Sequence, residues 1–372
     1  MRGVEVKRDA QADLYRVIGC LIVVAIHCWQ SRYGLDSSAS SIAISCGLAD
    51  GVAIFWLLSG FFMYKNYSYR KTMKRTIKTV AIPTICVSLV TFFLINNYLY
   101  NGVIGVEWHG KDEIIVASKT LLSWSNPILG MGHLWYVYVY ILLMIWSPIT
   151  YAFIKYLNED SRREKCFLIL SLAFLVWNDI SDNQLLELGH RGINGLLPAF
   201  VETVWGSLVY KYRKKFSKQK YGIYAVLAFV VLNVIRMVIQ IYRNSLYEGF
   251  AWILYWFSSI GLLCAVSMAI FCFSGIINCE KKTFYRVTTK MVACSFMIYL
   301  IHPLIIAFLD RKKIIDMIFH VCSILEMACL KKICFVVIST LLVTVLSIVV
   351  TEIIRFMVQI ARYILTQEKR GK

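Results

Sequence analysis

Long apolar segments, separated by shorter polar and charged stretches, recur along the whole chain. The first reads DLYRVIGCLIVVAIHCW over residues 13–29. Segments of this length match a hydrocarbon core about 30 Å thick. Because they are continuously apolar and do not alternate with polar residues, they predict membrane-spanning helices rather than barrel strands. The ten predicted spans are residues 14–30, 44–64, 79–98, 132–153, 166–178, 194–210, 221–242, 249–276, 290–309 and 332–359.

Lysine and arginine gather at the start of the chain and after every second predicted span. Loops rich in these residues remain on the cytoplasmic side of a membrane. The pattern therefore predicts an all-α polytopic membrane protein of about ten helices with both termini in the cytoplasm. We expect a single transmembrane domain over residues 1–372, closed by a short basic tail at 360–372. The basic segments are residues 2–8, 65–78, 162–165, 211–220, 281–290 and 362–370.

Residues 111–124, KDEIIVASKTLLSW, group apolar positions at roughly helical spacing beside charged ones. This pattern predicts an amphipathic helix on the outer membrane surface. A role in binding a partner is the alternative.

The composition agrees with this class of protein and excludes others. Of the 372 residues, 59% are hydrophobic and only 17% are charged. The net charge of +18 comes from short basic runs between apolar segments, which act as topology signals, so nucleic acid is not an expected partner. The twelve cysteines form no CxxC pair, and most lie inside apolar runs, where a free thiol behaves as a small hydrophobe. Neither a disulfide framework nor a zinc site is expected.

Two ionisable residues, Arg16 and His27, interrupt the first span. Eleven positions at 100° each place both side chains on one helix face, about 16 Å apart along the axis. Each has an ordinary explanation: Arg16 could extend to the lipid headgroups, and His27 could satisfy a neighbour in the bundle. As a pair on one face, they indicate a functional site.

A second set of polar residues is predicted to converge near the depth of His27, toward the outer side. Three histidines invite a metal-binding interpretation, but their side chains come singly from separate helices without an acidic fourth ligand, so no metal is expected. The residues of this set are Asp50, Ser59, His133, Trp135, Tyr136, Arg191, Asn194 and His302.

The chemistry of the first-span pair points to a phosphate-bearing donor. Histidine is the usual general base near neutral pH, and arginine is the usual clamp for phosphate. A base within the membrane and a phosphate clamp toward the cytoplasm suit a long donor threaded from the inside. Acyl-coenzyme A fits this description, with its phosphates near Arg16 and its thioester near His27.

Four motifs in order along the chain resemble the acyltransferase-3 family of membrane acyltransferases. They are R-x10-H from Arg16, FWLLSGF at 55–61, GHLWY at 132–136 and IYLIHPL at 298–304. The resemblance implies about ten helices in a bacterial cytoplasmic membrane. It also implies cytoplasmic acyl-CoA as donor, acetyl-CoA above all, and O-acetylation of a surface or periplasmic glycan.

The family's essential arginine and histidine map onto Arg16 and His27. Its LW and IHP signatures map onto residues 134–135 and 301–303. Many members carry an acidic residue where this chain has Ala53, and Asp50 is a candidate substitute. RGINGLLPAF, residues 191–200, resembles the branch that includes the membrane halves of vancomycin-resistance serine racemases.

The leading hypothesis is an O-acetyltransferase in which His27 takes the proton of the acceptor hydroxyl. Ser59, Trp135 or Tyr136 would hold the oxyanion. Ser59 could instead be an acylated nucleophile or a small packing residue beside Gly60. Expected partners are acyl-CoA, a glycan acceptor, membrane lipid and a second copy of the chain, with no bound cofactor. The alternative is a transporter of a small polar solute such as an amino acid, although matching halves are not apparent.

Overall fold

The computed structural model describes residues 9–34, 36–65, 67–94, 132–180, 195–246, 258–279 and 281–370. Every regular element within these ranges is helical, as the sequence predicts. The helices of the first half are α1 (Ala10–Tyr33), α2 (Ala39–Gly47), α3 (Gly51–Lys65), α4 (Tyr69–Thr76), α5 (Ile82–Leu94), α7 (Trp135–Ile145) and α8 (Ser147–Asn158). Those of the second half are α9 (Ser161–Ile180), α10 (Leu196–Tyr212), α11 (Gln219–Leu246), α12 (Ser259–Phe273), α13 (Lys282–Arg311), α14 (Ile314–Cys322) and α15 (Ala328–Arg370).

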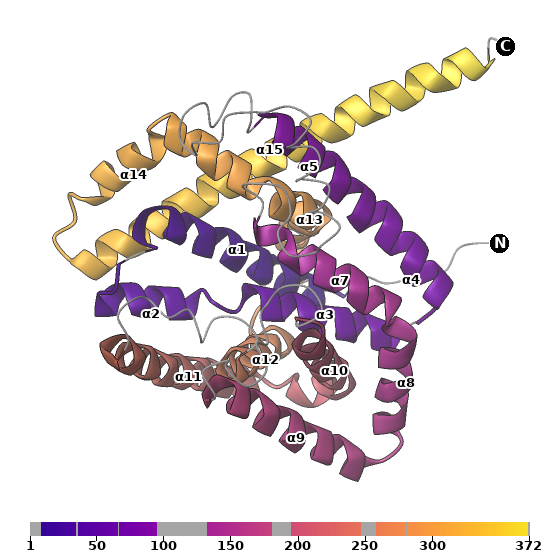
Figure 1. Cartoon of the computed structure of the whole chain (residues 1–372), viewed down its shortest axis with the longest axis vertical. Coiled ribbons are helices and arrows are strands. Elements are labelled where there is room, and N and C mark those ends of the chain that lie inside the picture. Colours follow the sequence, from indigo (N-terminus) through magenta and orange to yellow (C-terminus); the bar gives the residue numbers. More distant parts are fainter. Residues whose placement is uncertain are drawn as a thin grey trace.

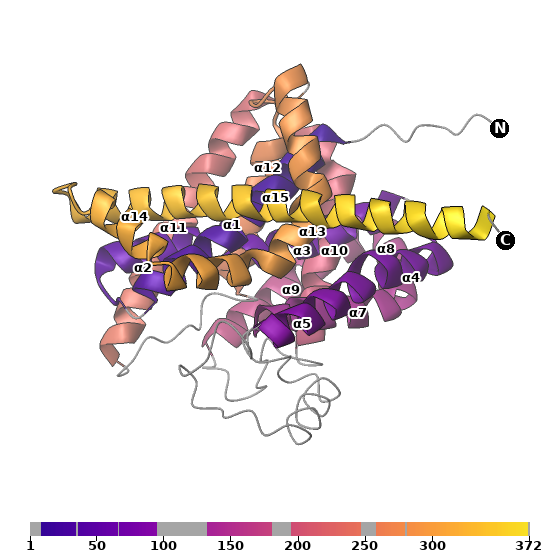
Figure 2. The ribbon, with the colours of Figure 1, turned by 90° about the horizontal axis from the view of Figure 1, so that it is seen from above.

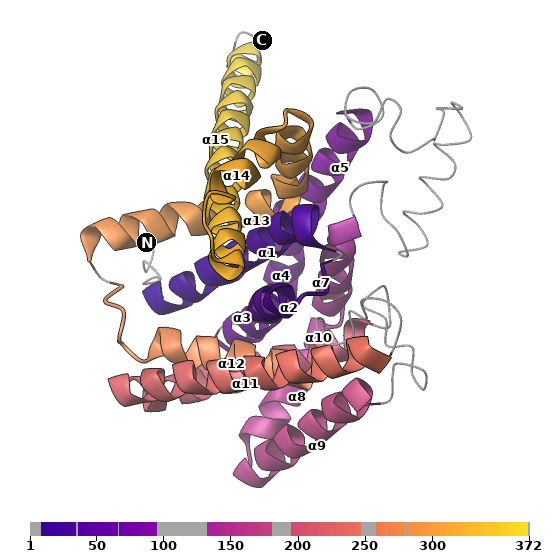
Figure 3. The same ribbon diagram turned by 90° about the vertical axis from the view of Figure 1, so that its left-hand side faces the viewer.

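Helix α1 lies in the middle of the molecule and contacts α3, α12, α13 and α15. Helices α13, α14 and α15 lie on one side of it, and α9, α11 and α12 lie on the other (Figures 1 and 3). Seen from above, the C-terminal end of α15 projects beyond the rest of the molecule (Figure 2). The first span of the sequence is therefore the central helix of the fold.

The outward faces of the peripheral helices are apolar. On α11, Ile223, Leu227, Val230 and Val234 are each at least half exposed, and they follow one another at helical spacing. The inward face of the same helix carries Arg236, which is 1% exposed. Apolar side chains outside and polar side chains inside are the arrangement that lipid requires. The chain is a multi-pass membrane protein.

Five of the described helices are long and apolar enough to cross a membrane, and a sixth is added if α7 and α8 count as one broken span. Each of the ten predicted spans overlaps a described helix, but α5, α10 and α12 are shorter than a full span in the described residues. The amphipathic helix predicted at 111–124 lies outside the described residues.

The predicted span over 132–153 consists of two helices, because the chain bends by 68° between α7 and α8, which together are long and apolar enough for one broken span. The bend falls at Trp146, and Pro148 stands in the first turn of the second helix. Proline lacks the backbone N–H that would continue α7 and also disfavours the helical conformation of the preceding residue. The predicted span 44–64 falls almost entirely within Ala39–Met63, a stretch that is long and apolar enough for one membrane span, although residues 48–50 separate α2 from α3.

Helices α3 and α10 approach each other closely at two glycines. A Cβ atom on Gly60 would lie 1.7 Å from the carbonyl oxygen of Thr203, and one on Gly206 would lie 1.9 Å from that of Leu57. Only glycine allows backbones to approach to this distance. Because Ser59 neighbours Gly60, this contact also fixes the helix turn that carries Ser59.

Candidate active site

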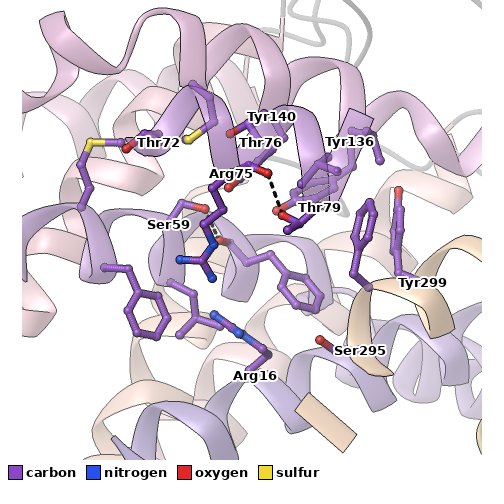
Figure 4. A pocket seen from close by; sticks show the side chains of 18 of the residues that line it. Arg16, Ser59, Thr72, Arg75, Thr76, Thr79, Tyr136, Tyr140, Ser295 and Tyr299 are labelled. Carbon is purple, nitrogen blue, oxygen red and sulfur yellow. Dashed lines mark hydrogen bonds between the residues drawn. The ribbon is translucent and has the colours of Figure 1, made fainter. Parts of the chain in front are cut away.

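A cavity of about 410 Å³ opens beside the N-terminal half of α1. Its walls come from α1, α3, α4, α7 and α13, together with the π-helical turn Ile77–Ala81 that joins α4 to α5. Figure 4 shows its polar side chains pointing inward from these elements. They are Arg16, Ser59, Thr72, Arg75, Thr76, Thr79, Tyr136, Tyr140, Ser295 and Tyr299.

The guanidinium groups of Arg16 and Arg75 point toward each other across this cavity (Figure 4). Among the described residues, neither has a carboxylate within ion-pair distance. The ring of Phe62 lies beneath Arg16, with its centroid 5.1 Å from the Arg16 Cζ atom. Asp13, one turn before Arg16 on α1, offsets part of its charge, but the two guanidinium groups still repel each other across the cavity, so an anion between them would be stabilised by both.

The π-helical turn brings Arg75 and Thr79 onto the same wall of the cavity. The Thr79 hydroxyl donates a hydrogen bond of 3.0 Å to the Arg75 carbonyl, within a turn wider than an α-helical one. Single π-helical turns occur often at functional sites. The sequence pattern placed Arg75 only in a basic cytoplasmic segment and gave no sign of this turn.

The structure brings the rings of His27, His133 and His302 together, on helices α1 and α13 and at the start of α7. The ring centroid of His302 lies 4.8 Å from that of His27 and 5.4 Å from that of His133. The rings of His27 and His133 are 6.3 Å apart. Among the described residues, no group of three or more His, Cys, Asp or Glu side chains is placed to hold a metal ion.

Backbone carbonyls set the tautomer of two of these histidines. The Nδ1 atom of His27 lies 2.8 Å from the Val23 carbonyl oxygen, and that of His302 lies 2.8 Å from the Tyr299 carbonyl oxygen. Because a carbonyl oxygen only accepts, Nδ1 must donate in each ring, and the neutral ring then carries its lone pair on Nε2. His27 therefore presents Nε2 as a base.

The I-H-P motif explains the partner of His302. Pro303 has no N–H to donate to the carbonyl of Tyr299, four residues earlier in α13. The side chain of His302 donates to that carbonyl instead. The proline thus frees the acceptor that holds the histidine ring.

A second, smaller pocket of about 60 Å³ lies on the His27 side. His27, His133 and Trp135 line it, together with Tyr136 and Tyr299, which also line the larger cavity. The centroids of the two tyrosine rings are 5.7 Å apart, and the Tyr299 hydroxyl donates to the His133 carbonyl. Tyr136 and Tyr299 therefore lie between the larger cavity, which contains Arg16 and Arg75, and the smaller pocket, which contains His27.

Asp50 lies apart from both spaces, although the sequence placed it at the outer edge of the site. Its Oδ1 atom is 2.7 Å from an Nη atom of Arg236, and both side chains are 1% exposed. A second Nη atom of Arg236 donates to the Cys46 carbonyl. Asp50 is therefore part of a buried ion pair between the start of α3 and α11.

Ser59 lines the larger cavity, but its hydroxyl donates a hydrogen bond of 2.8 Å to the Phe55 carbonyl. Its proton is thus held by the backbone of α3. Arg191 and Asn194 lie outside the described residues. The residues that sequence reasoning missed are Arg75, Tyr140, Tyr299 and Arg236. A charge in the middle of the predicted span 221–242 was the signal that could have revealed Arg236.

Histidine rings, tyrosines and cations enclosed by apolar helices suit acid–base chemistry within a membrane. A family model described as an acyltransferase domain matches residues 9–352, nearly the whole chain. The chain belongs to the acyltransferase-3 family. The curated proteins and the solved structures contain no match to this sequence.

Proposed function

We propose that the protein is an O-acetyltransferase that moves an acetyl group from cytoplasmic acetyl-CoA to a hydroxyl of a surface or periplasmic glycan. The observation that carries the proposal is the pair of spaces that meet at Tyr136 and Tyr299. One space contains two cations that form no ion pair among the described residues, and the other contains a histidine base. Membership of an acyltransferase family supports group transfer over the alternative of solute transport.

The donor would occupy the larger cavity. Its diphosphate would bind between Arg16 and Arg75, whose facing guanidinium groups match two anionic groups. The thioester would then extend along α1 toward Tyr136 and Tyr299, the residues shared with the smaller pocket. The acceptor hydroxyl would reach the same point from the His27 side.

At the meeting point, Nε2 of His27 would take the proton of the acceptor hydroxyl while its oxygen attacks the thioester carbonyl. The new C–O bond gives a tetrahedral oxyanion, which the hydroxyl of Tyr136, a residue that lines both spaces, would stabilise. Collapse of the oxyanion breaks the C–S bond, and the departing thiolate takes the proton from His27. Ser59 is less suited to hold the oxyanion because its proton is bound to the Phe55 carbonyl.

This route requires the larger cavity to face the cytoplasm. Ten spans with both termini in the cytoplasm, in a bacterial cytoplasmic membrane, would provide that orientation. A reporter fused after Ser217 should then register as cytoplasmic, and one inserted near His109 as external. The opposite signals would reverse the assignment of donor and acceptor sides.

The proposal is tested by replacing His27 in cells that carry no other copy of the protein. His27→Ala should remove the acetyl groups from the surface polysaccharide, seen as a mass loss of one acetyl per modified hydroxyl. The purified variant should still bind acetyl-CoA, because Arg16 and Arg75 are unchanged.

One added alanine between Val23 and Val24 provides the geometric control. It rotates His27 by about 100° relative to Arg16 and should abolish transfer although both side chains remain. Normal acetylation in cells with His27→Ala would show that the histidine is a packing residue.

A further inference from the structure

Basic residues form a stripe along the first turns of α13, outside the active site. Lys282, Arg286 and Lys290 are exposed and follow one another at intervals of four residues, so their side chains share one helix face. The stripe ends one turn before Ala293, and Ala293 lines the larger cavity. A row of basic side chains therefore runs along the surface of α13 to the rim of the larger cavity.

Arg355 of α15 joins the stripe at this rim. One Nη atom donates a hydrogen bond of 2.7 Å to the Ala293 carbonyl, and the other lies 3.0 Å from a carboxylate oxygen of Glu352. Lys290 lies three residues, about one helical turn, before Ala293, whose carbonyl accepts the hydrogen bond from Arg355. The two cations are therefore neighbours beside the cavity wall.

The position of Arg355 differs from that of a mobile surface charge. Two hydrogen bonds hold its guanidinium at the rim, while its side chain remains 41% exposed. Such preorganisation lowers the entropy lost when an anion binds. Glu352 neutralises part of this charge, but Lys290 and Arg286 leave the rim positive.

We propose that Lys290 and Arg355 bind the 3′-phosphate of the donor's nucleotide. This inference rests on the proposed function. Coenzyme A carries anionic groups in two places, a diphosphate next to the pantetheine arm and a phosphomonoester on the ribose. The cations are divided in the same way, with Arg16 and Arg75 inside the cavity and Lys290 and Arg355 at its rim. A phosphomonoester has the charge and acceptor oxygens to bind both rim cations.

The experiment compares two donors that differ only in this phosphate. The full chain, in nanodiscs of zwitterionic lipid, is titrated with acetyl-CoA and with 3′-dephospho-acetyl-CoA. The wild-type protein should bind acetyl-CoA about tenfold more tightly. Lys290→Ala and Arg355→Gln should each reduce this preference, and the double variant should abolish it without weakening the binding of the dephospho compound.

Lys282→Ala is the matched control. It removes the same charge from the same stripe, about 12 Å further from the rim, and should keep the preference. Because the Lys290 side chain is exposed, Lys290→Ala decides the matter even if Arg355→Gln does not fold.

Three outcomes would overturn the inference. Equal binding of both donors by the wild-type protein would show that the 3′-phosphate has no site. If Lys290→Ala weakened the binding of both donors equally, the stripe would act only by long-range attraction of the donor. A loss of the preference for acetyl-CoA in Lys282→Ala would lead to the same conclusion. If the wild-type protein binds neither donor, the proposed function itself fails.

Discussion

Two of the described arginines within the helical bundle have opposite surroundings: one has an ion-pair partner and the other has none. Arg236 of α11 is 1% exposed and has Asp50 and the Cys46 carbonyl as partners. Arg16 of α1 faces a cavity, and its nearest charged neighbour across that cavity is another cation, Arg75. Among the described residues, Arg16 has no carboxylate within ion-pair distance.

The difference shows how a buried cation can be assigned a role. Burying a charge costs several kcal/mol unless a partner compensates it. The fold itself compensates Arg236, whose role is to join α11 to the start of α3. Arg16 forms no such ion pair among the described residues and faces an open space, with Asp13 one turn before it on α1 as a nearby acidic group. Arg236 joins two helices, whereas Arg16 is proposed to bind a ligand.

The largest expected effect follows from removing the partner of Arg236. Asp50→Ala leaves a buried guanidinium without its carboxylate and should destabilise the protein by about 3–5 kcal/mol. Thermal unfolding of the purified protein, followed by size-exclusion profiles, measures this loss. A variant as stable as the wild type would show that the pair is not a structural element.

The double variant Asp50→Ala with Arg236→Met sharpens the same comparison. It removes both charges and replaces the guanidinium with an apolar side chain of similar length. Most of the lost stability should return, because the cost of one buried, unpaired charge disappears.

Arg16→Ala should have the opposite signature. Folding should change much less than in Asp50→Ala, because Arg16 forms no ion pair among the described residues and loses only a longer-range attraction to Asp13. Donor binding should weaken by about 1–3 kcal/mol, which is roughly five- to 150-fold in Kd. Titration with acetyl-CoA measures the change, and Arg16→Lys should restore it only in part because an ammonium lacks the planar fork. If Arg16→Ala destabilised the protein without changing its affinity for acetyl-CoA, Arg16 would have a structural role like that of Arg236.

Ser59→Ala should have a smaller effect on transfer. Its hydroxyl proton is held by the Phe55 carbonyl, so the loss should remain well below the roughly hundredfold cost of removing an oxyanion donor. Initial rates of acetyl transfer measure it. Complete loss of transfer with normal donor binding would instead identify Ser59 as the acylated nucleophile.

The smallest expected effect concerns a third cation, Lys332, whose partner Asp36 lies between α1 and α2. Burial raises the pKa of Asp36, but hydrogen bonds from Lys332, Ser41 and Ser38 lower it more, so the pKa lies below its ordinary range.

A carboxyl group with a lowered folded-state pKa stabilises the protein above its unfolded pKa, about 3.9, and this contribution is lost as the pH falls further. Asp36→Asn should therefore lower the thermal midpoint slightly at neutral pH and much less at pH values below about 3. A pH-independent difference would contradict this assignment.

Helix positions were the most predictable part of the fold. Hydropathy reports which segments can be buried in lipid, and each of the ten predicted spans overlaps a described helix. It does not report where a helix breaks, so the bend at Trp146 was missed. Pro148 carried that information locally.

The parts of the candidate site that the sequence could predict are those that depend only on spacing within a helix or on the order of the spans. The common face of Arg16 and His27 follows from their spacing in one helix, and the similar depths of three histidines follow from the order of the spans. The pairing of Asp50 with Arg236 depends on how α3 and α11 pack, which spacing along the chain cannot supply. The position of Arg75 depends on a π-helical turn that has no residue signature.

The interlocked glycines of α3 and α10 set a limit on how the donor cavity can change shape. Gly60 and Gly206 each face the carbonyl of the opposite helix, so sliding one helix along the other would drive backbone into backbone. The wall that carries Ser59 and Phe62 is therefore a fixed template against α10. An acyl chain longer than the space permits cannot be accommodated by moving that wall. Under the proposed function, a preference for longer acyl groups would require changes on the facing wall, formed by α4, α7 and α13.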